Sequence, residues 1–367
     1  MPDTQLDTAI RNWQARMVAN GVDVNDYQRV AGSVDTWEDW LPAWEGLGDR
    51  LASEAADAER AGRKETAGEL WRRAASAYHF GKFVWVVDIE LHGRAGRKAA
   101  DALGNALRLL DPSAQRLEIP FDGASMVAIY RRPAGGAPGS LLPPPRQRAQ
   151  RRPLPLVVII PGLDSTKEEF YETEAVLHQR GMATLTLEGP GQGETGLALP
   201  LRHDYEVPVG VALDFIRDVD TVDHERIGLL GVSLGGYYAP RVAAFEPRVR
   251  AVAAVSGPFN FGACWDDLPQ MTRETFQHTS LARDPDDARR RASELDLAGV
   301  AVRIEQPLLV MTGDRDRIIP WEQTKRIADE AQNATWKLYA GGTHVVNNMP
   351  YLYRNLAADW LRERLTA

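Results

Sequence analysis

A serine in the segment Gly231–Gly235 has the clearest potential for nucleophilic chemistry in this sequence. The segment reads Gly-Val-Ser-Leu-Gly, and Ser233 at its centre follows the predicted strand Arg226–Leu230 and precedes a helix expected over Leu234–Phe245. A tight turn between a strand and a helix exposes the central hydroxyl, and the flanking glycines let the backbones pass close together. The pattern therefore predicts a serine nucleophile, and an ordinary glycine-rich turn is the alternative interpretation.

Later in the chain, a histidine and an aspartate are suited to activate a serine nucleophile. The hydroxyl needs a base, and an imidazole base needs an acid that orients it. His344 follows the last predicted strand, which suits the chain order serine, acid, histidine. Asp316, in the loop after the apolar run 307–311, is the expected acid. We assign its neighbour Asp314 to a turn and His278 to the surface or to a lid.

Acyl transfer also requires hydrogen-bond donors for the oxyanion that forms on the attacked carbonyl. The backbone N–H of Leu234, directly after the serine, is one expected donor. The other is expected from Leu163, after the apolar strand Leu156–Ile160, where Gly162 allows a close approach. The glycine-rich segment Glu188–Glu194 has neither of the known phosphate-loop spacings, so it does not predict nucleotide binding.

Strands and helices that alternate from residue 154 onward are expected to position these residues. With two strands before them, they predict an α/β fold with a mostly parallel eight-stranded sheet and helices on both faces. Residues 258–303 interrupt the alternation and predict a lid insertion over the strand ends, where such sheets bind ligands. Its aromatic residues Phe259, Phe261 and Trp265 are candidates for substrate contacts, with packing of the lid as the alternative.

Residues 1–112 are predicted to form a helical domain ahead of a catalytic domain that spans 113–367. Apolar residues recur at helical spacing over three stretches, the last of which ends at Leu110, before Pro112. Six of the ten tryptophans lie in this part of the chain. Packing between helices is the favoured interpretation of these tryptophans, and contact with a ligand shared with the catalytic domain is the alternative.

Composition excludes several other classes of protein. The 367 residues are 44% hydrophobic and 26% charged, as in soluble globular proteins, and the net charge of -8 disfavours nucleic-acid binding. The single Cys264 allows neither an internal disulfide nor a cysteine-based zinc site, and no metal or cofactor is expected. The sequence shows no signal peptide and no membrane-spanning run, which predicts a cytoplasmic location.

Residues 132–155 are predicted to form a solvated basic loop, with partner or anion binding as the alternative.

Five segments, in this order along the chain, resemble the α/β-hydrolase superfamily. They read PGLDSTKEEF, LEGPGQGET, GVSLGGYYAPR, MTGDRDRIIP and GGTH. The helical part ahead of them is similar to that of the family of 2,6-dihydroxypseudooxynicotine hydrolase, a C–C bond hydrolase of nicotine breakdown. Fungal polyketide-shortening hydrolases and a group of esterases are related to it. The resemblance covers about residues 10–365 and implies an N-terminal helical cap and a homodimer. The stretch GPFNFGACWDD contains no acid before Asp266, which weakens transfer of the nicotine-related substrate.

These observations predict a serine hydrolase that acts on a sizeable, partly aromatic small-molecule carbonyl substrate. The bond broken is a C–C bond of a ketone or diketone, or else an ester, and the resemblance slightly favours the C–C bond. Two alternatives belong to other classes. One is an acyltransferase or cyclase whose lid excludes water, and the other is a binding module with a decayed site.

Overall fold

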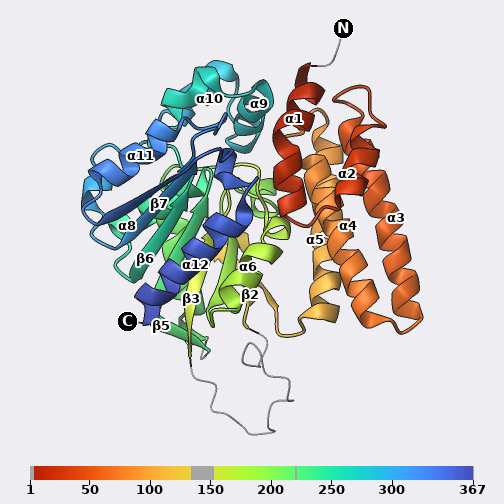
Figure 1. Ribbon diagram of the computed structural model, residues 1–367, viewed down its shortest axis with the longest axis horizontal. Helices are drawn as coiled ribbons and strands as arrows, with labels where there is room; N and C mark the ends of the chain where they lie inside the picture. The colour runs from red at the N-terminus through yellow and green to blue at the C-terminus, as the bar shows by residue number, and fades with distance from the viewer. Residues whose placement is uncertain (1–3, 134–152, 220, 367) are drawn as a thin grey trace, which may run out of the picture.

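The computed structural model describes residues 4–133, 153–219 and 221–366. A helical N-terminal region precedes a mostly parallel eight-stranded sheet with helices on both faces, and the two parts pack side by side (Figure 1). The α/β fold predicted from the sequence is therefore confirmed. Most of the predicted basic loop 132–155 lies outside the described residues.

The sheet has one antiparallel end and a parallel remainder. Its strands are β1 Gln115–Phe121, β2 Ala124–Arg131, β3 Leu154–Ile160, β4 Ala183–Glu188, β5 Val222–Val232, β6 Val249–Val255, β7 Leu308–Gly313 and β8 Ala334–Tyr339. They lie in the order β1-β2-β4-β3-β5-β6-β7-β8. Strand β2 is antiparallel to β1 and β4, and all other neighbours are parallel. Because parallel strands share a direction, the loops that follow β3, β5, β6 and β7 meet at one edge of the sheet.

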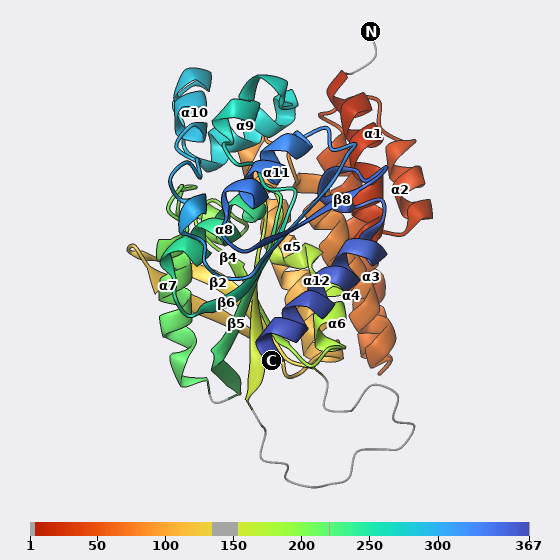
Figure 2. The same cartoon turned by 60° about the vertical axis from the view of Figure 1, so that its left-hand side comes forward.

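Alternate side chains of β3 enter two hydrophobic layers, one on each face of the sheet. The helices that cover the sheet are α6 Tyr171–His178, α7 Glu206–Phe215, α8 Gly235–Phe245, α11 Trp321–Glu330 and α12 Pro350–Thr366. Leu156 and Val158 pack in the layer of α7, α8 and α11, whereas Val157 and Ile159 pack with α6 and α12. Figure 2 shows α12 and α6 on one side of the sheet and α7 and α8 on the other. A central strand buried on both faces explains the unbroken apolar run in its sequence.

Five helices make up the N-terminal region, and tryptophans form much of its core. They are α1 Thr4–Ala19, α2 Val24–Ala31, α3 Trp40–Arg60, α4 Lys64–Lys82 and α5 Ile89–Leu110. Five of its tryptophans are at most 3% exposed, namely Trp13, Trp37, Trp40, Trp44 and Trp85. The expectation that they pack between helices is confirmed. Helix α3 begins at Trp40, after a turn in which Thr36 hydrogen-bonds the carboxylate of Asp39.

The insertion between β6 and β7 contains two helices, α9 Gln270–Thr279 and α10 Pro285–Ala292. They lie at the top of the molecule in Figure 1, beside the start of α1. Gln5 of α1 donates a hydrogen bond to Glu274 of α9 at 3.3 Å. The insertion and the helical region therefore meet beside the edge of the sheet at which the loops gather.

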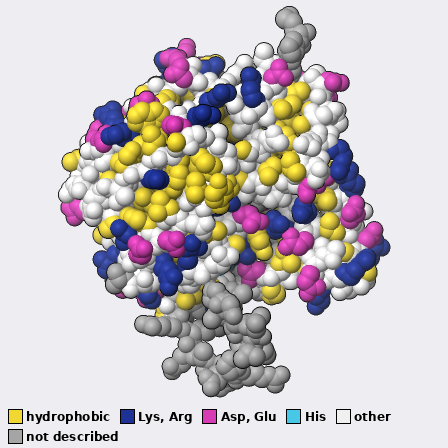
Figure 3. Space-filling view, viewed as in Figure 1, with side chains coloured by type: hydrophobic (Ala, Val, Ile, Leu, Met, Phe, Trp, Pro, Cys, Tyr) yellow, Lys and Arg dark blue, Asp and Glu magenta, His cyan; other side chains and the backbone are white. Residues whose placement is uncertain are grey.

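The surface of the two parts differs in the view of Figure 3. Hydrophobic side chains gather over the sheet-containing part, and acidic and basic side chains are interspersed over the helical part. Among the described residues, none of the helices combines the length and the apolar character needed to cross a membrane.

Candidate active site

Ser233 lies in a sharp turn between β5 and α8. Its backbone φ is 55°, a left-handed conformation that is uncommon for residues other than glycine. The flanking glycines are needed because a Cβ at Gly231 would overlap the carbonyl of Gly235, and one at Gly235 would overlap the carbonyl of Ile160. Such a strained, tightly packed turn places the serine hydroxyl at the edge of the sheet.

Ser233, His344 and Asp316 come together from three different loops. His344 Nε2 lies 2.8 Å from Ser233 Oγ, and His344 Nδ1 lies 2.8 Å from Asp316 Oδ2. The Asp316 side chain is fully buried, and its Oδ1 accepts hydrogen bonds from the backbone N–H groups of Ile318 and Ile319, both at 2.9 Å. This arrangement fixes the carboxylate so that Oδ2 faces the imidazole.

Asp314, the other acid of this loop, points elsewhere. Its Oδ1 accepts a hydrogen bond from the backbone N–H of Gly341 at 2.7 Å. Asp314 therefore ties the loop after β7 to the loop that precedes His344, and it makes no hydrogen bond to the imidazole.

Two hydroxyl groups that the sequence analysis did not single out support the histidine loop. Ser256 Oγ accepts a hydrogen bond from the backbone N–H of Val345 at 3.0 Å and lies 2.8 Å from Thr312 Oγ1. Val345 and Val346 have φ values of 56° and 53°, which are unfavourable for β-branched residues. The contact with Ser256 holds this strained backbone directly after His344.

Two backbone N–H groups remain available next to Ser233. Neither Leu163 nor Leu234 donates its N–H to another group of the described chain, although both residues are buried. The Leu163 loop approaches the serine so closely that a Cβ on Gly162 would lie 2.9 Å from Ser233 Cβ. Both N–H groups are therefore available to donate to an acceptor atom of a ligand.

Comparison with known proteins places the chain in a family. The sequence profile of the family described as "Esterase FrsA-like" matches residues 14–366. The chain belongs to the FrsA-like esterase family. It is a hydrolase with the α/β-hydrolase fold, as its relatives indicate.

The relatives of this FrsA-like chain include bacterial and fungal hydrolases. It is 30% identical over 360 residues to 2,6-dihydropseudooxynicotine hydrolase of Paenarthrobacter nicotinovorans. The aligned region covers 97% of this chain and 92% of the relative. The crystal structure titled 2,6-dihydroxy-pseudo-oxynicotine hydrolase matches with a TM-score of 0.84 and 29% identity over 96% of both chains. The 20-hydroxy-prefusarin hydrolase of Gibberella moniliformis is 31% identical over 273 residues, 69% of this chain and 59% of that protein.

The glycine-rich segment Glu188–Glu194 of this FrsA-like chain braces the Leu163 loop. Gln192 Nε2 donates hydrogen bonds to the carbonyl oxygens of Pro161 at 2.7 Å and Gly162 at 3.0 Å. Its Oε1 accepts from the N–H of Gly189 at 3.0 Å. These contacts fix the backbone whose next N–H is that of Leu163. Sequence spacing could not reveal this role, because the partners are about 30 residues apart along the chain.

A buried ion pair joins the same loop to the helical region. Arg16 of α1 is 5% exposed and forms ion pairs with Asp164 at 3.0 Å and Glu169 at 2.8 Å. Burial raises the pKa of the Glu169 carboxyl, but the Arg16 guanidinium and the hydrogen bond from His79 outweigh it, so that this pKa lies below its usual value. Because Asp164 directly follows Leu163, helix α1 helps to set the position of that backbone N–H.

The three aromatic candidates of the insertion are buried in its packing. Phe261 and Trp265 contact Phe276 of α9 with ring centroids 5.3 and 5.6 Å apart, and Phe259 lies beneath the Arg326 guanidinium. None of the three lines the cavities beside Ser233 or Lys82. Their contact with substrate therefore stays a prediction.

Cys264, the single cysteine, is buried near the site. Burial, with Asp316 and Asp267 nearby, raises the pKa of its thiol to about 12. The thiol is therefore protonated near neutral pH and is a poor nucleophile.

Proposed function

We propose that this protein is a serine hydrolase in which Ser233 attacks a carbonyl carbon. The observation that carries the proposal is the continuous chain of contacts from Ser233 Oγ through His344 to Asp316. His344 Nε2 takes the hydroxyl proton as Oγ attacks, while Asp316 holds the Nδ1–H tautomer. The backbone N–H groups of Leu163 and Leu234 donate to the oxygen that becomes negatively charged.

The substrate that we propose is a carbonyl compound with an aromatic part, and the bond broken is a C–C bond of a ketone or an ester bond. In C–C cleavage the departing carbon takes the proton from His344 Nε2, and an acyl-Ser233 ester remains. In ester cleavage the alkoxide oxygen takes that proton. In both cases water, deprotonated by His344, then releases the acid and restores the Ser233 hydroxyl.

Residues 1–112 are proposed to act as a cap over this site. Support comes from the Arg16 ion pairs to the loop that carries Leu163 and from the contact between α1 and α9. A cap that touches both the oxyanion loop and the insertion limits the access of water to the acyl-enzyme. A homodimer, which the family resemblance predicts, is tested by light scattering on the purified protein.

The test of this function combines active-site labelling with a substrate panel. A fluorophosphonate probe should label the wild type and the Ser33→Ala variant, which changes an exposed serine, but not Ser233→Ala. Loss of the nucleophile should lower kcat by about 10⁴- to 10⁶-fold. Turnover of aryl esters, aryl amides or aromatic 1,3-diketones then identifies the bond that is broken. In heavy-oxygen water, hydrolysis gives an acid product that carries the heavy oxygen. Labelling of Ser233→Ala at the wild-type rate would refute the assignment, and an unlabelled acyl product would indicate transfer to another acceptor.

A further inference from the structure

Lys82, the last residue of α4, has a buried amine without a bonded partner in the described part of the chain. The residue is 6% exposed, and its Nζ forms no hydrogen bond or ion pair with the described part of the chain. The neighbouring Lys167, which is equally buried, forms ion pairs with Glu168, Glu188 and Glu194. A buried ammonium that lacks such partners is unfavourable, so the position of Lys82 requires an explanation.

The Lys82 side chain lines a cavity of about 50 Å³ between the helical region and the sheet edge. Leu163, whose N–H is the proposed oxyanion donor, lines the same cavity. Val84 also lines it and has a φ of 45°, a strained conformation for a β-branched residue. The cavity is large enough for one small polar group, since a water molecule occupies about 30 Å³ in the liquid.

Two imidazoles, those of His92 and His278, line this cavity together with the polar residues Asp164, Ser165, Thr166, Thr275 and Thr279. His92 Nδ1 lies 2.8 Å from the carbonyl oxygen of Trp85, so Nδ1 carries the proton and donates it. Burial lowers the pKa of His92 to about 3, and the ring is neutral with an unprotonated Nε2. His278 lies against His92 with ring centroids 5.8 Å apart, and burial lowers its pKa as well. Because both imidazoles are neutral near pH 7, Lys82 is the residue lining this cavity that gains a positive charge when an anion binds beside it.

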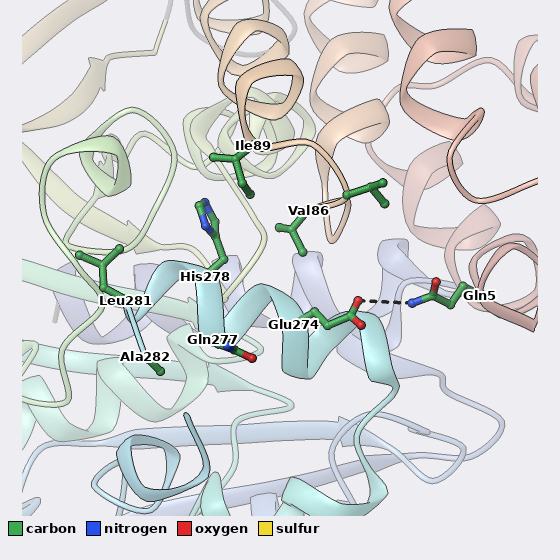
Figure 4. Close-up of a pocket in the computed structure, with 9 residues that line it drawn as sticks. Gln5, Val86, Ile89, Glu274, Gln277, His278, Leu281 and Ala282 are labelled. Carbon is green, nitrogen blue, oxygen red and sulfur yellow. Dashed lines mark hydrogen bonds between the residues drawn. The ribbon is translucent and has the colours of Figure 1, made fainter. Parts of the chain in front are cut away.

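An open groove of about 630 Å³ adjoins this cavity at His278, which lines both. Figure 4 shows the groove between Val86 and Ile89 on one side and α9 on the other. Its lining also includes Leu281, which is 63% exposed, and Gln277 of α9. The groove has the volume and the apolar side chains to hold the larger part of a substrate whose polar end enters the cavity.

We propose that Lys82 is a specificity residue that binds an anionic oxygen of the substrate, either a carboxylate or an ionised phenol or enol. This inference rests on the proposed function, because it requires the reacting carbonyl to lie at Leu163, which lines the Lys82 cavity. Ser233 lines a neighbouring cavity of about 10 Å³, and Ser165 lines both. Burial lowers the pKa of Lys82, because the carboxylates of Asp164, Glu168 and Glu188, which act at longer range than an ion pair, do not offset the loss of water around the amine. They leave its Nζ without a hydrogen-bond acceptor, and an anionic ligand oxygen would supply one.

The kinetic test compares two esters of nearly equal shape, mono-p-nitrophenyl glutarate and neutral p-nitrophenyl 5-methylhexanoate. The wild type should prefer the glutarate, and Lys82→Met should lower the ratio of the two kcat/KM values by about 10- to 100-fold. Lys98→Met, which removes a cation that pairs with Glu45 and Asp49 on α3, should leave the ratio unchanged. A merely structural role of Lys82 would affect both esters equally.

A binding test separates this proposal from the proposed function, because it needs no turnover. Benzoate and 4-nitrophenolate are titrated into the wild type and into Lys82→Met by calorimetry, with methyl benzoate and 4-nitroanisole as neutral controls. Tighter binding of one anion by the wild type than by the variant supports the site and identifies the kind of oxygen it takes. A wild type that neither prefers the glutarate nor binds either anion would overturn the inference, even if Lys82→Met fails to fold.

Discussion

Replacement of Asp316 by asparagine should almost abolish turnover through the tautomer of His344. The Asp316 Oδ1 accepts from two backbone N–H groups, those of Ile318 and Ile319, and an asparagine side-chain oxygen can keep both bonds. The amide NH₂ is then forced into the position of Oδ2, 2.8 Å from His344 Nδ1. Since NH₂ can only donate, Nδ1 must accept, and the ring proton moves to Nε2. A protonated Nε2 cannot take the proton of Ser233.

The expected loss in kcat for Asp316→Asn is about 10⁴-fold, as in serine proteases whose catalytic histidine is held in the wrong tautomer. This loss corresponds to an increase of about 5.4 kcal/mol in the activation free energy. The fold should persist because the substitution keeps the shape and two of the three hydrogen bonds. The assay is hydrolysis of a p-nitrophenyl ester, with thermal unfolding to verify the fold. Asp314→Asn is the matched control, since Asp314 bonds only the Gly341 N–H in this loop, and it should stay within tenfold of wild type. An active Asp316→Asn beside an inactive Asp314→Asn would refute the reasoning.

Three further changes test the support of the site. Gly162→Ala places a Cβ 2.9 Å from Ser233 Cβ and should shift the Leu163 loop, lowering kcat by about 10² with little change in KM, measured on the same ester. Arg16→Met removes the guanidinium from Asp164 and Glu169 and should lower the free energy of unfolding by about 3–5 kcal/mol in urea titrations, whereas Arg29→Met, which removes an exposed ion pair, should cost under about 1 kcal/mol. Stability should fall as the pH drops from 7 to 5, because unfolded His92 titrates near its usual pKa of 6.5 and the folded ring only at about 3, so the unfolded chain binds the proton first. The His92→Gln variant should lose less stability over this interval, and an equal loss would contradict that pKa.

Local patterns were sufficient to predict the fold, and they singled out three residues, Ser233, Asp316 and His344, whose side chains the structure brings into contact. The turn around Ser233 depends on residues within a few positions of it, and the buried central strand β3 is recognisable by its unbroken apolar run Leu156–Ile160. Chain order then restricted the choice of histidine and acid to a few candidates. The positions of these three residues relative to one another follow from the sheet, which explains why a pattern in sequence could anticipate them.

The supporting residues could not be predicted, since their partners are distant in the sequence. Arg16 and Asp164 are 148 positions apart, and Ser256 and Val345 are 89 apart. No periodicity distinguishes Arg16 from the exposed arginines of other helices. The direction in which Phe261 points was equally hidden, because it depends on how α9 folds back over the insertion.

In our proposals, the residues that break the bond and the residues that select the substrate come from different parts of the chain. The proposed nucleophile, base and acid all follow strands of the sheet, whereas Lys82 and His92 come from α4 and α5. A substitution in the helices can therefore change the charge of the cavity without moving a group that takes part in bond breaking. The Arg16 ion pairs limit this independence, since they couple α1 to the loop of the oxyanion donor. We therefore expect changes at Lys82 to appear as ratios between substrates, and changes at Arg16 to appear equally with every substrate.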